Sequence, residues 1–154
     1  MAVEIERKFR VTRTDFLDGV DGERLIQGYL SHARQATVRV RVRDDQAWLT
    51  IKGETRGARR SEFEYPIPAD DARAMLEEMC PEGVIDKTRY RLPLDGHVWE
   101  VDVFHGDNHG LVVAEIELDH EDQPFTRPPW LGEEVTGDPR YYNSALSRTP
   151  YGRW

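Results

Sequence analysis

The chain has 154 residues, of which 38% are hydrophobic and 32% are charged, and its formal net charge is −8. This length predicts one domain, residues 1–154, with a sizeable core, and the acidic balance argues against a nucleic-acid-binding surface. No apolar run is as long as a membrane span, and the acidic start around Glu4 is unlike a signal peptide, so we expect a cytoplasmic protein with no membrane partner. A single cysteine, Cys80, excludes an intramolecular disulfide.

The first expected strand, residues 3–9, carries charge on one of its two faces. Because strand side chains alternate between faces, Glu4, Glu6 and Lys8 form one row, while Ile5 and Phe9 point to the other face. Two carboxylates can bind a divalent cation through hard oxygen ligands, and the ammonium can contact an anion held by that cation. The plain alternative is a solvated strand face with internal ion pairs.

The same alternation recurs along the chain and predicts further strands. Residues 38–43 give the clearest signal, since valine and arginine alternate strictly there. The expected strands are residues 3–9, 25–30, 38–43, 48–52, 62–65, 84–92, 98–104 and 111–118. The charged residues alternating on them are Glu4, Glu6, Lys8, Arg39, Arg41, Arg43, Lys52, Glu62, Glu64, Lys87, Arg89, Arg91, Glu100, Asp102, Glu115 and Glu117.

Helical segments are few. Residues 70–80 predict one amphipathic helix. Its apolar positions include Met79 and Cys80, and we expect these side chains to lie in the core. A short turn is expected at residues 14–19. A second short helix is expected over residues 138–146, with Asp138 as its cap.

One face of the expected sheet is almost entirely ionic, and the other is apolar. An ordinary sandwich or small barrel points its apolar residues at the centre. A closed antiparallel barrel with a charged, water-filled lumen explains both faces, provided that other elements cover its outside. The sequence therefore predicts an α+β fold, mainly antiparallel β, with the helix at 70–80 and the aromatic tail on the outer face.

Such a lumen would bring cation-binding strands close to anion-binding strands. The ligand that best fits such a lumen is a metal complex of a polyphosphate. Mg²⁺ is coordinated jointly by carboxylate, water and phosphate oxygens, and arginine and lysine bind the phosphate oxygens that the metal leaves. Phosphoryl transfer needs mainly positioning and charge neutralisation. For any one residue, the alternative is that its charge simply balances another across the lumen.

These residues resemble the CYTH, or triphosphate tunnel metalloenzyme, family along nearly the whole chain. The family signature ExExK corresponds to Glu4, Glu6 and Lys8. Residues 27–30 and 132–136 look most like the short bacterial members, among which inorganic tripolyphosphatases occur. The match continues through Arg39, Arg41, Lys52, Glu62, Glu64, Lys87, Arg89, Asp102, Glu115 and Glu117.

The resemblance implies a closed eight-stranded tunnel that binds triphosphate with Mg²⁺ or Mn²⁺, and it implies residue roles. Lys8 and Tyr29 would be catalytic, acting as charge stabilisers, with Glu62 and Glu64 as supporting tunnel carboxylates. The phosphate-binding residues would be Lys8, Arg39, Arg41, Lys52, Lys87 and Arg89. The metal ligands would be Glu4, Glu6 and Glu117, with Asp102 and Glu115 assisting directly or through water. Arg43, Arg91 and Glu100 continue the pattern without an assigned role.

The expected reaction is metal-dependent hydrolysis of the terminal phosphoanhydride of inorganic tripolyphosphate, with nucleoside triphosphates as further candidate substrates. Three alternatives stay open: an adenylate cyclase that makes cyclic AMP from ATP, a thiamine triphosphatase, and a polyphosphate-binding module without turnover. The sequence is compatible with a monomer and with a homodimer.

Overall fold

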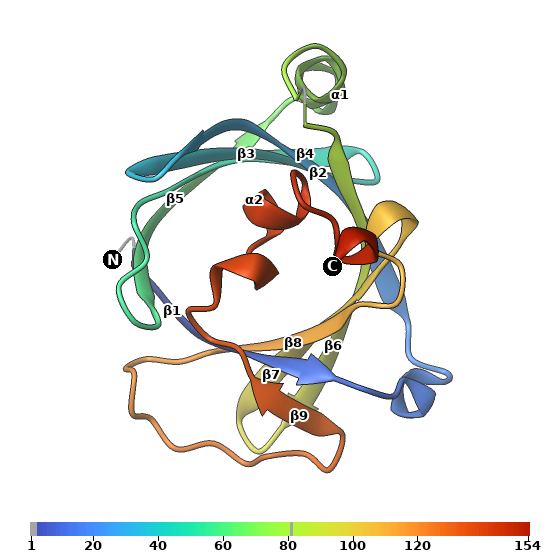
Figure 1. Cartoon of the computed structure of the whole chain (residues 1–154), viewed down its shortest axis with the longest axis vertical. Helices are drawn as coiled ribbons and strands as arrows, with labels where there is room; N and C mark the ends of the chain where they lie inside the picture. Colours follow the sequence, from blue (N-terminus) through green and yellow to red (C-terminus); the bar gives the residue numbers. More distant parts are fainter. Residues whose placement is uncertain (1–2, 81) are drawn as a thin grey trace.

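The computed structural model describes residues 3–80 and 82–154 and shows a ring of antiparallel strands (Figure 1). The strands are β1 (Val3–Val11), β2 (Gly22–Ala33), β3 (Ala36–Arg43), β4 (Gln46–Lys52), β5 (Arg59–Ile67), β6 (Val84–Leu94), β7 (His97–Phe104), β8 (Val112–Glu117) and β9 (Leu131–Glu134). The helices are η1 (Asp15–Leu17), α1 (Ala69–Glu78), η2 (Gly106–Asn108), η3 (Pro139–Tyr141), α2 (Asn143–Leu146) and η4 (Tyr151–Arg153).

Strand β1 closes the ring. The strand order is β5-β4-β3-β2-β6-β7-β8-β1, and β1 also pairs with β5, through Val3 to Ile5. Along its other edge, β1 pairs with β8 from Glu6 to Arg10. Strand β9 joins β1 further along, where Phe9 lies opposite Glu134. The predicted closed eight-stranded antiparallel barrel is therefore confirmed, with β9 as an addition.

The apolar outer face is covered in the way that the alternation predicts. Helix α1 packs over β3 and β4, where Val40, Ala47 and Ala72 are buried together (Figure 1). On the other side of the ring of strands, Trp99 is fully buried on the outer face, and the indole of Trp130 packs edge-on against the indole of Trp99. Burial of such apolar surface is the main stabilising contribution to the fold.

The last part of the chain differs from the prediction. We name residues 135–146 the C-terminal segment. It does not only cover the outside: α2 lies within the ring in Figure 1, and Leu146 and Tyr141 are buried against Ile85 and Phe104. Ile85 and Phe104 stand two positions from Lys87 and Asp102, so by alternation they face the lumen. The lumen is thus apolar at one end, and the C-terminal segment fills that end.

Smaller corrections concern the helices. The expected helix at 138–146 is two short pieces, η3 and α2, separated at Tyr142, although Asp138 does cap it by accepting a hydrogen bond from the Arg140 backbone amide at 3.1 Å. Helix α1 ends at Glu78, and Met79 just beyond it is 51% exposed, so its predicted core position was wrong. Cys80 is buried as expected. Among the described residues, no helix has the length and apolarity needed to cross a membrane.

Gly28 on β2 lies close to the last turn of α1 and to Cys80 beyond it. A Cβ atom there would lie 2.6 Å from Cys80 Sγ and 2.9 Å from Leu76 Cδ2. We expect Gly28→Val to lower the free energy of unfolding by about 1–3 kcal/mol, because overpacking forces neighbouring side chains to shift. Gly53→Ala is the matched control, since its Cβ would meet Ser61 at 3.4 Å, and it should change stability by less than about 0.5 kcal/mol. Equal thermal denaturation midpoints for the two variants would contradict this packing.

Candidate active site

A polar cavity of about 280 Å³ runs inside the ring of strands. Every site residue expected from the sequence lines it except Asp102. The shared feature of these residues is that they alternate with outward-facing apolar residues on the strands. The expected residues in its lining are Glu4, Glu6, Lys8, Tyr29, Arg39, Arg41, Lys52, Glu62, Glu64, Lys87, Arg89, Glu115 and Glu117.

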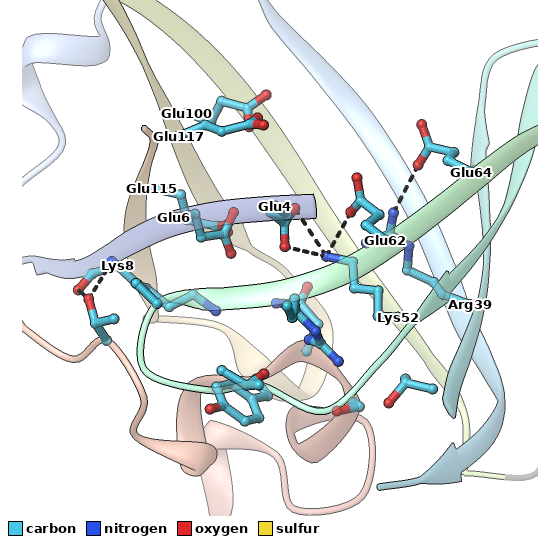
Figure 2. A pocket seen from close by; sticks show the side chains of 18 of the residues that line it. Glu4, Glu6, Lys8, Arg39, Lys52, Glu62, Glu64, Glu100, Glu115 and Glu117 are labelled. Atoms are coloured by element: carbon cyan, nitrogen blue, oxygen red, sulfur yellow. Dashed lines mark hydrogen bonds and ion pairs between the residues drawn. The ribbon is translucent and has the colours of Figure 1, made fainter. Parts of the chain in front are cut away.

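Glutamates crowd one wall of the cavity, and we call Glu4, Glu6, Glu115 and Glu117 the acidic wall. They come from β1 and β8, whose register places Glu6 directly opposite Glu117. Figure 2 shows Glu6 beside Glu115, and Glu117 next to Glu100. Like charges directly opposite each other on a sheet are destabilising, so this wall needs a compensating positive charge or protons.

Protonation equilibria in the acidic wall reflect that crowding. Burial, followed by the charges of Glu115 and Glu4, raises the pKa of Glu6 well above its usual range. Burial also raises the pKa of Glu117, with Glu4 and Glu100 adding to the effect. Burial alone would raise the pKa of Glu115, but Lys8 and a hydrogen bond with Glu6 lower it well below its usual range. Of these two neighbours, Glu6 therefore takes up a proton more readily than Glu115.

This donor set fits a hard divalent cation. Carboxylate oxygens are the ligands that Mg²⁺ and similar ions prefer, and a bound cation would neutralise the negative charge crowded on this wall. As placed, however, no three His, Cys, Asp or Glu side chains of the described residues come together as a finished metal site. One reason is visible in Figure 2: Glu4 is engaged by Lys52, whose Nζ lies 3.1 Å from Glu4 Oε1 and 3.2 Å from Glu62 Oε2.

Cations gather on the part of the cavity next to the C-terminal segment. Lys8 Nζ donates to the Tyr141 carbonyl oxygen at 3.2 Å. Burial opposes its charged form, but the carboxylates of Glu115 and Glu6 outweigh burial and raise the pKa of Lys8. This lysine therefore keeps its proton and can stabilise negative charge.

Lys87 is buried and Arg41 is half-buried, and both cations have too little compensating charge around them. Burial, with help from Arg89 and Arg41, lowers the pKa of Lys87 to about 7, although Asp102 favours the charged form. Burial also lowers the pKa of Arg41, as do Arg39 and Arg89 nearby. Bringing a polyanion into the cavity would relieve this repulsion, so the arrangement fits an anion site.

Arg39, like Lys87 and Arg41, could bind an anion in addition to its present partners. Its Nη2 donates to Thr50 Oγ1 at 3.1 Å and to Glu64 Oε2 at 3.4 Å, and Thr50 itself donates to Glu64 at 2.8 Å. Its Nε is buried without a hydrogen-bond partner in the part of the chain that the structure describes. A buried donor without a partner is costly, and a phosphate oxygen in the cavity would satisfy such a donor.

Asp102 lies behind the wall of the cavity. It is fully buried, and its Oδ2 accepts hydrogen bonds from Lys87 Nζ at 2.7 Å and from Arg89 Nη2 at 2.9 Å, while Oδ1 accepts from Arg89 Nε at 2.8 Å. Arg89 also lies 3.4 Å from Glu100 and 3.7 Å from Glu115. Asp102 thus anchors two of the predicted phosphate-binding cations, and its participation in metal binding stays a prediction.

Several lining residues were missed by the sequence interpretation. Arg60 lines the cavity, and it stands two positions before Glu62, so extending the alternation by one step would have found it. Tyr142 and Asn143 line it as well, from the C-terminal segment, where no alternation signals an inward position. Of the unassigned residues, Arg91 and Glu100 line the cavity. Arg43 stacks on Trp48, with 4.9 Å between the guanidinium carbon and the ring centre.

Two bacterial inorganic triphosphatases match the chain over nearly its full length. An inorganic triphosphatase of Acetivibrio thermocellus is 47% identical over 98% of this chain and 97% of its own. An inorganic triphosphatase of Nitrosomonas europaea is 41% identical over 94% of this chain and 96% of its own. A solved structure of an inorganic triphosphatase superposes with a TM-score of 0.67, at 37% identity, over 94% of this chain and 97% of that one.

The family comparison agrees with the geometry of the cavity. The model of the CYTH domain matches residues 2–145, which include all the strands and all the lining residues of the cavity. Such a match, together with relatives that are more than 40% identical along almost the whole chain, shows the family directly. The chain belongs to the CYTH family and is similar to bacterial inorganic triphosphatases.

Proposed function

We propose that this protein is an inorganic triphosphatase, which hydrolyses the terminal phosphoanhydride of tripolyphosphate with the help of a divalent cation. The observation that carries the proposal is the division of one cavity between an acidic wall and a cluster of cations whose charge is incompletely compensated. A metal complex of a linear polyphosphate has both kinds of charge. The names of the two relatives described above support the same reaction.

The cationic residues hold the substrate. Lys8, Arg39, Arg41, Lys52, Lys87 and Arg89 contact phosphate oxygens, as expected from the sequence. Arg41 offers the planar fork that binds two phosphate oxygens at once, whereas Lys8 and Lys87 act as point charges. The C-terminal segment fills the apolar end of the lumen, so the triphosphate lies between that segment and the acidic wall.

The acidic wall holds the cation, for which we propose Mg²⁺ or Mn²⁺. Glu4, Glu6, Glu115 and Glu117 would supply oxygen ligands, with Glu62 and Glu64 as supporting carboxylates beside Lys52 and Arg39. When bound, such an ion neutralises charge on phosphate oxygens and lowers the pKa of a coordinated water. Asp102 contributes by fixing Lys87 and Arg89 and stays a candidate ligand through water.

Hydrolysis then forms a bond from a water oxygen to the terminal phosphorus and breaks the bond from that phosphorus to the bridging oxygen. The products are orthophosphate and pyrophosphate, and a carboxylate of the acidic wall orients the attacking water and accepts its proton. Lys8 and Tyr29 stabilise the negative charge that develops in the transition state. Tyr29 lines the cavity and is almost fully buried.

The contact between Lys52 and Glu4 leads to a prediction about metal affinity. Lys52 lies between Glu4 and Glu62, so it occupies, with its positive charge, a place close to where the cation is expected. In the absence of triphosphate, Lys52→Gln should therefore bind Mn²⁺ more tightly, by about threefold to fivefold. The same variant should bind tripolyphosphate more weakly, because it has lost a phosphate contact.

Calorimetric titration with Mn²⁺ and then with tripolyphosphate measures both effects. Arg24→Gln is the control: it also removes one positive charge, but Arg24 pairs with Asp86, at 2.6 Å, and is largely exposed. It should leave both affinities unchanged. A Lys52→Gln variant that binds Mn²⁺ more weakly than the wild type would show that Lys52 does not compete for Glu4.

Release of orthophosphate tests the proposed function and its rivals together. Tripolyphosphate, ATP and thiamine triphosphate are incubated with Mg²⁺, Mn²⁺ or a chelator, and the ATP reaction is also assayed for cyclic AMP. Metal-dependent release mainly from tripolyphosphate supports the proposal. Release mainly from thiamine triphosphate, cyclic AMP from ATP, or binding without any turnover would each replace it. We also propose a single domain over residues 1–154 in the cytoplasm, with a monomer or homodimer to be distinguished by sedimentation.

A further inference from the structure

Two amides connect the C-terminal segment to cations on two strands of the barrel. Asn143 Oδ1 accepts hydrogen bonds from Lys87 Nζ and from Gln27 Nε2, both at 2.9 Å. Gln27 Oε1 in turn accepts a hydrogen bond from Arg41 Nε at 2.7 Å. Gln27 is completely buried, and Lys87 is 1% exposed. A continuous path of hydrogen bonds therefore joins Lys87 on β6 to Arg41 on β3 through Asn143 and Gln27.

The direction of every bond in this path is fixed by chemistry. Arginine and protonated lysine side chains only donate, so each end of the path demands an amide oxygen. Gln27 must turn its oxygen to Arg41, which leaves its NH₂ group for Asn143. Asn143 must turn its oxygen to Lys87, and the same oxygen accepts from Gln27. The two amides can satisfy both cations in only this orientation.

Neutral acceptors at these positions leave positive charge available to the substrate. A carboxylate in place of either amide would hold the cation equally well, but it would also neutralise the cation and repel phosphate. The bond to Gln27 uses only Nε of Arg41, so both terminal nitrogens remain for phosphate oxygens. Lys87 donates to Asp102 and to Asn143, which leaves the third N–H of its ammonium group for a phosphate oxygen. Asn143 itself lines the cavity.

We propose that Asn143 and Gln27 are positioning residues that aim Lys87 and Arg41 at the triphosphate without neutralising them. The C-terminal segment is then part of the substrate site, in addition to its packing role at the apolar end of the lumen. This inference rests on the proposed function, because tripolyphosphate is the anion that the cations are aimed at. It concerns residues that contact cations and need not themselves touch the reacting atoms.

Asn143→Asp gives the sharpest test, since it keeps the shape of the side chain and the acceptor oxygen but adds a negative charge. Tripolyphosphate binding is measured by calorimetry in the presence of a chelator, so that no metal contributes. We expect the dissociation constant to rise by about tenfold or more, and KM in the metal-dependent assay to rise more than kcat falls. Ser147→Ala is the control: Ser147 directly follows the C-terminal segment, and its hydroxyl donates to the Ser144 carbonyl at 2.7 Å and not to a cation, so binding should stay within about twofold.

A purely structural role for Asn143 predicts a different result. Asn143→Asp would then change the melting temperature while tripolyphosphate binding stayed at the wild-type value, and that result would overturn the proposal. If Asn143→Asp does not fold, Asn143→Ser replaces it, because a serine hydroxyl is too short to reach both Lys87 and Gln27; wild-type binding by that variant would also overturn the proposal. Absence of tripolyphosphate binding by the wild type both in the chelator and with Mg²⁺ would instead refute the proposed function.

Discussion

Lys8→Ala is expected to lower kcat for tripolyphosphate by about a hundredfold to a thousandfold, which is the usual effect of removing a transition-state charge stabiliser. Lys8 is almost fully buried, held by the Tyr141 carbonyl, and kept charged by Glu115 and Glu6. Its loss removes a positive charge that water cannot replace at the same place. Mn²⁺ affinity should change much less than turnover, because the carboxylates of the acidic wall remain.

Arg7→Ala is the matched control for Lys8→Ala. Arg7 is the preceding residue on β1, but its side chain points to the outside of the barrel and pairs with Glu134 at 2.6 Å. Its removal should leave kcat within about threefold of the wild type, since surface ion pairs contribute little. Steady-state kinetics measures kcat for both variants at equal concentrations of folded protein. Wild-type turnover by Lys8→Ala would remove Lys8 from the catalytic residues.

Glu6→Gln should reduce metal-dependent turnover by at least about a hundredfold, because it removes a carboxylate ligand from the acidic wall. The same change should not destabilise the protein in a chelator. Glu6 lies opposite Glu117 and is hydrogen-bonded to Glu115, so a neutral amide relieves repulsion between carboxylates. Activity is therefore expected to fall while the melting temperature without metal stays equal or rises.

Electron paramagnetic resonance of Mn²⁺ separates a lost ligand from a distorted fold. The Glu6→Gln variant should leave most of the Mn²⁺ free at a concentration that saturates the wild type. Glu78→Gln, on the exposed face of α1, is the control and should bind Mn²⁺ as the wild type does. Normal Mn²⁺ binding together with normal turnover in Glu6→Gln would show that Glu6 is not a ligand.

The barrel could be predicted because strand periodicity is a local property. In β3, each valine from Val38 to Val42 faces outward, and each arginine between them faces the lumen, as the pattern alone indicates. The same reasoning identified the cavity lining on β1, β6 and β8. On β5 it missed Arg60, because the strand expected from the sequence began only at residue 62, whereas the strand in the structure begins at Arg59.

The position of the C-terminal segment could not be predicted in the same way. Asp138 and Pro139 mark the start of a helix, but capping residues say nothing about which surface a helix contacts. A weaker signal was present on the strands. Ile85 and Phe104 continue the inward-facing positions of Lys87 and Asp102 with apolar residues, so that end of the lumen had to be filled by an apolar partner. Leu146 and Tyr141 provide it.

Residue-level roles depend on contacts that only the three-dimensional arrangement supplies. Asp102 alternates with apolar residues just as Glu115 does, yet it lies behind the cavity wall with both oxygens bonded to cations. Gln27 and Asn143 are uncharged and far apart in the sequence, so no pattern of charge could link them to Lys87 and Arg41. Neutral residues that orient charged ones are in general invisible to charge patterning.

The most direct test of the central claim is ³¹P nuclear magnetic resonance of tripolyphosphate incubated with the wild-type protein, first in a chelator and then with Mg²⁺ or Mn²⁺ in excess. We expect no hydrolysis in the chelator and, with the cation, conversion of each tripolyphosphate into one orthophosphate and one pyrophosphate. Tripolyphosphate resonances that broaden on binding but persist with either cation would contradict hydrolysis and leave the tunnel as a binding site.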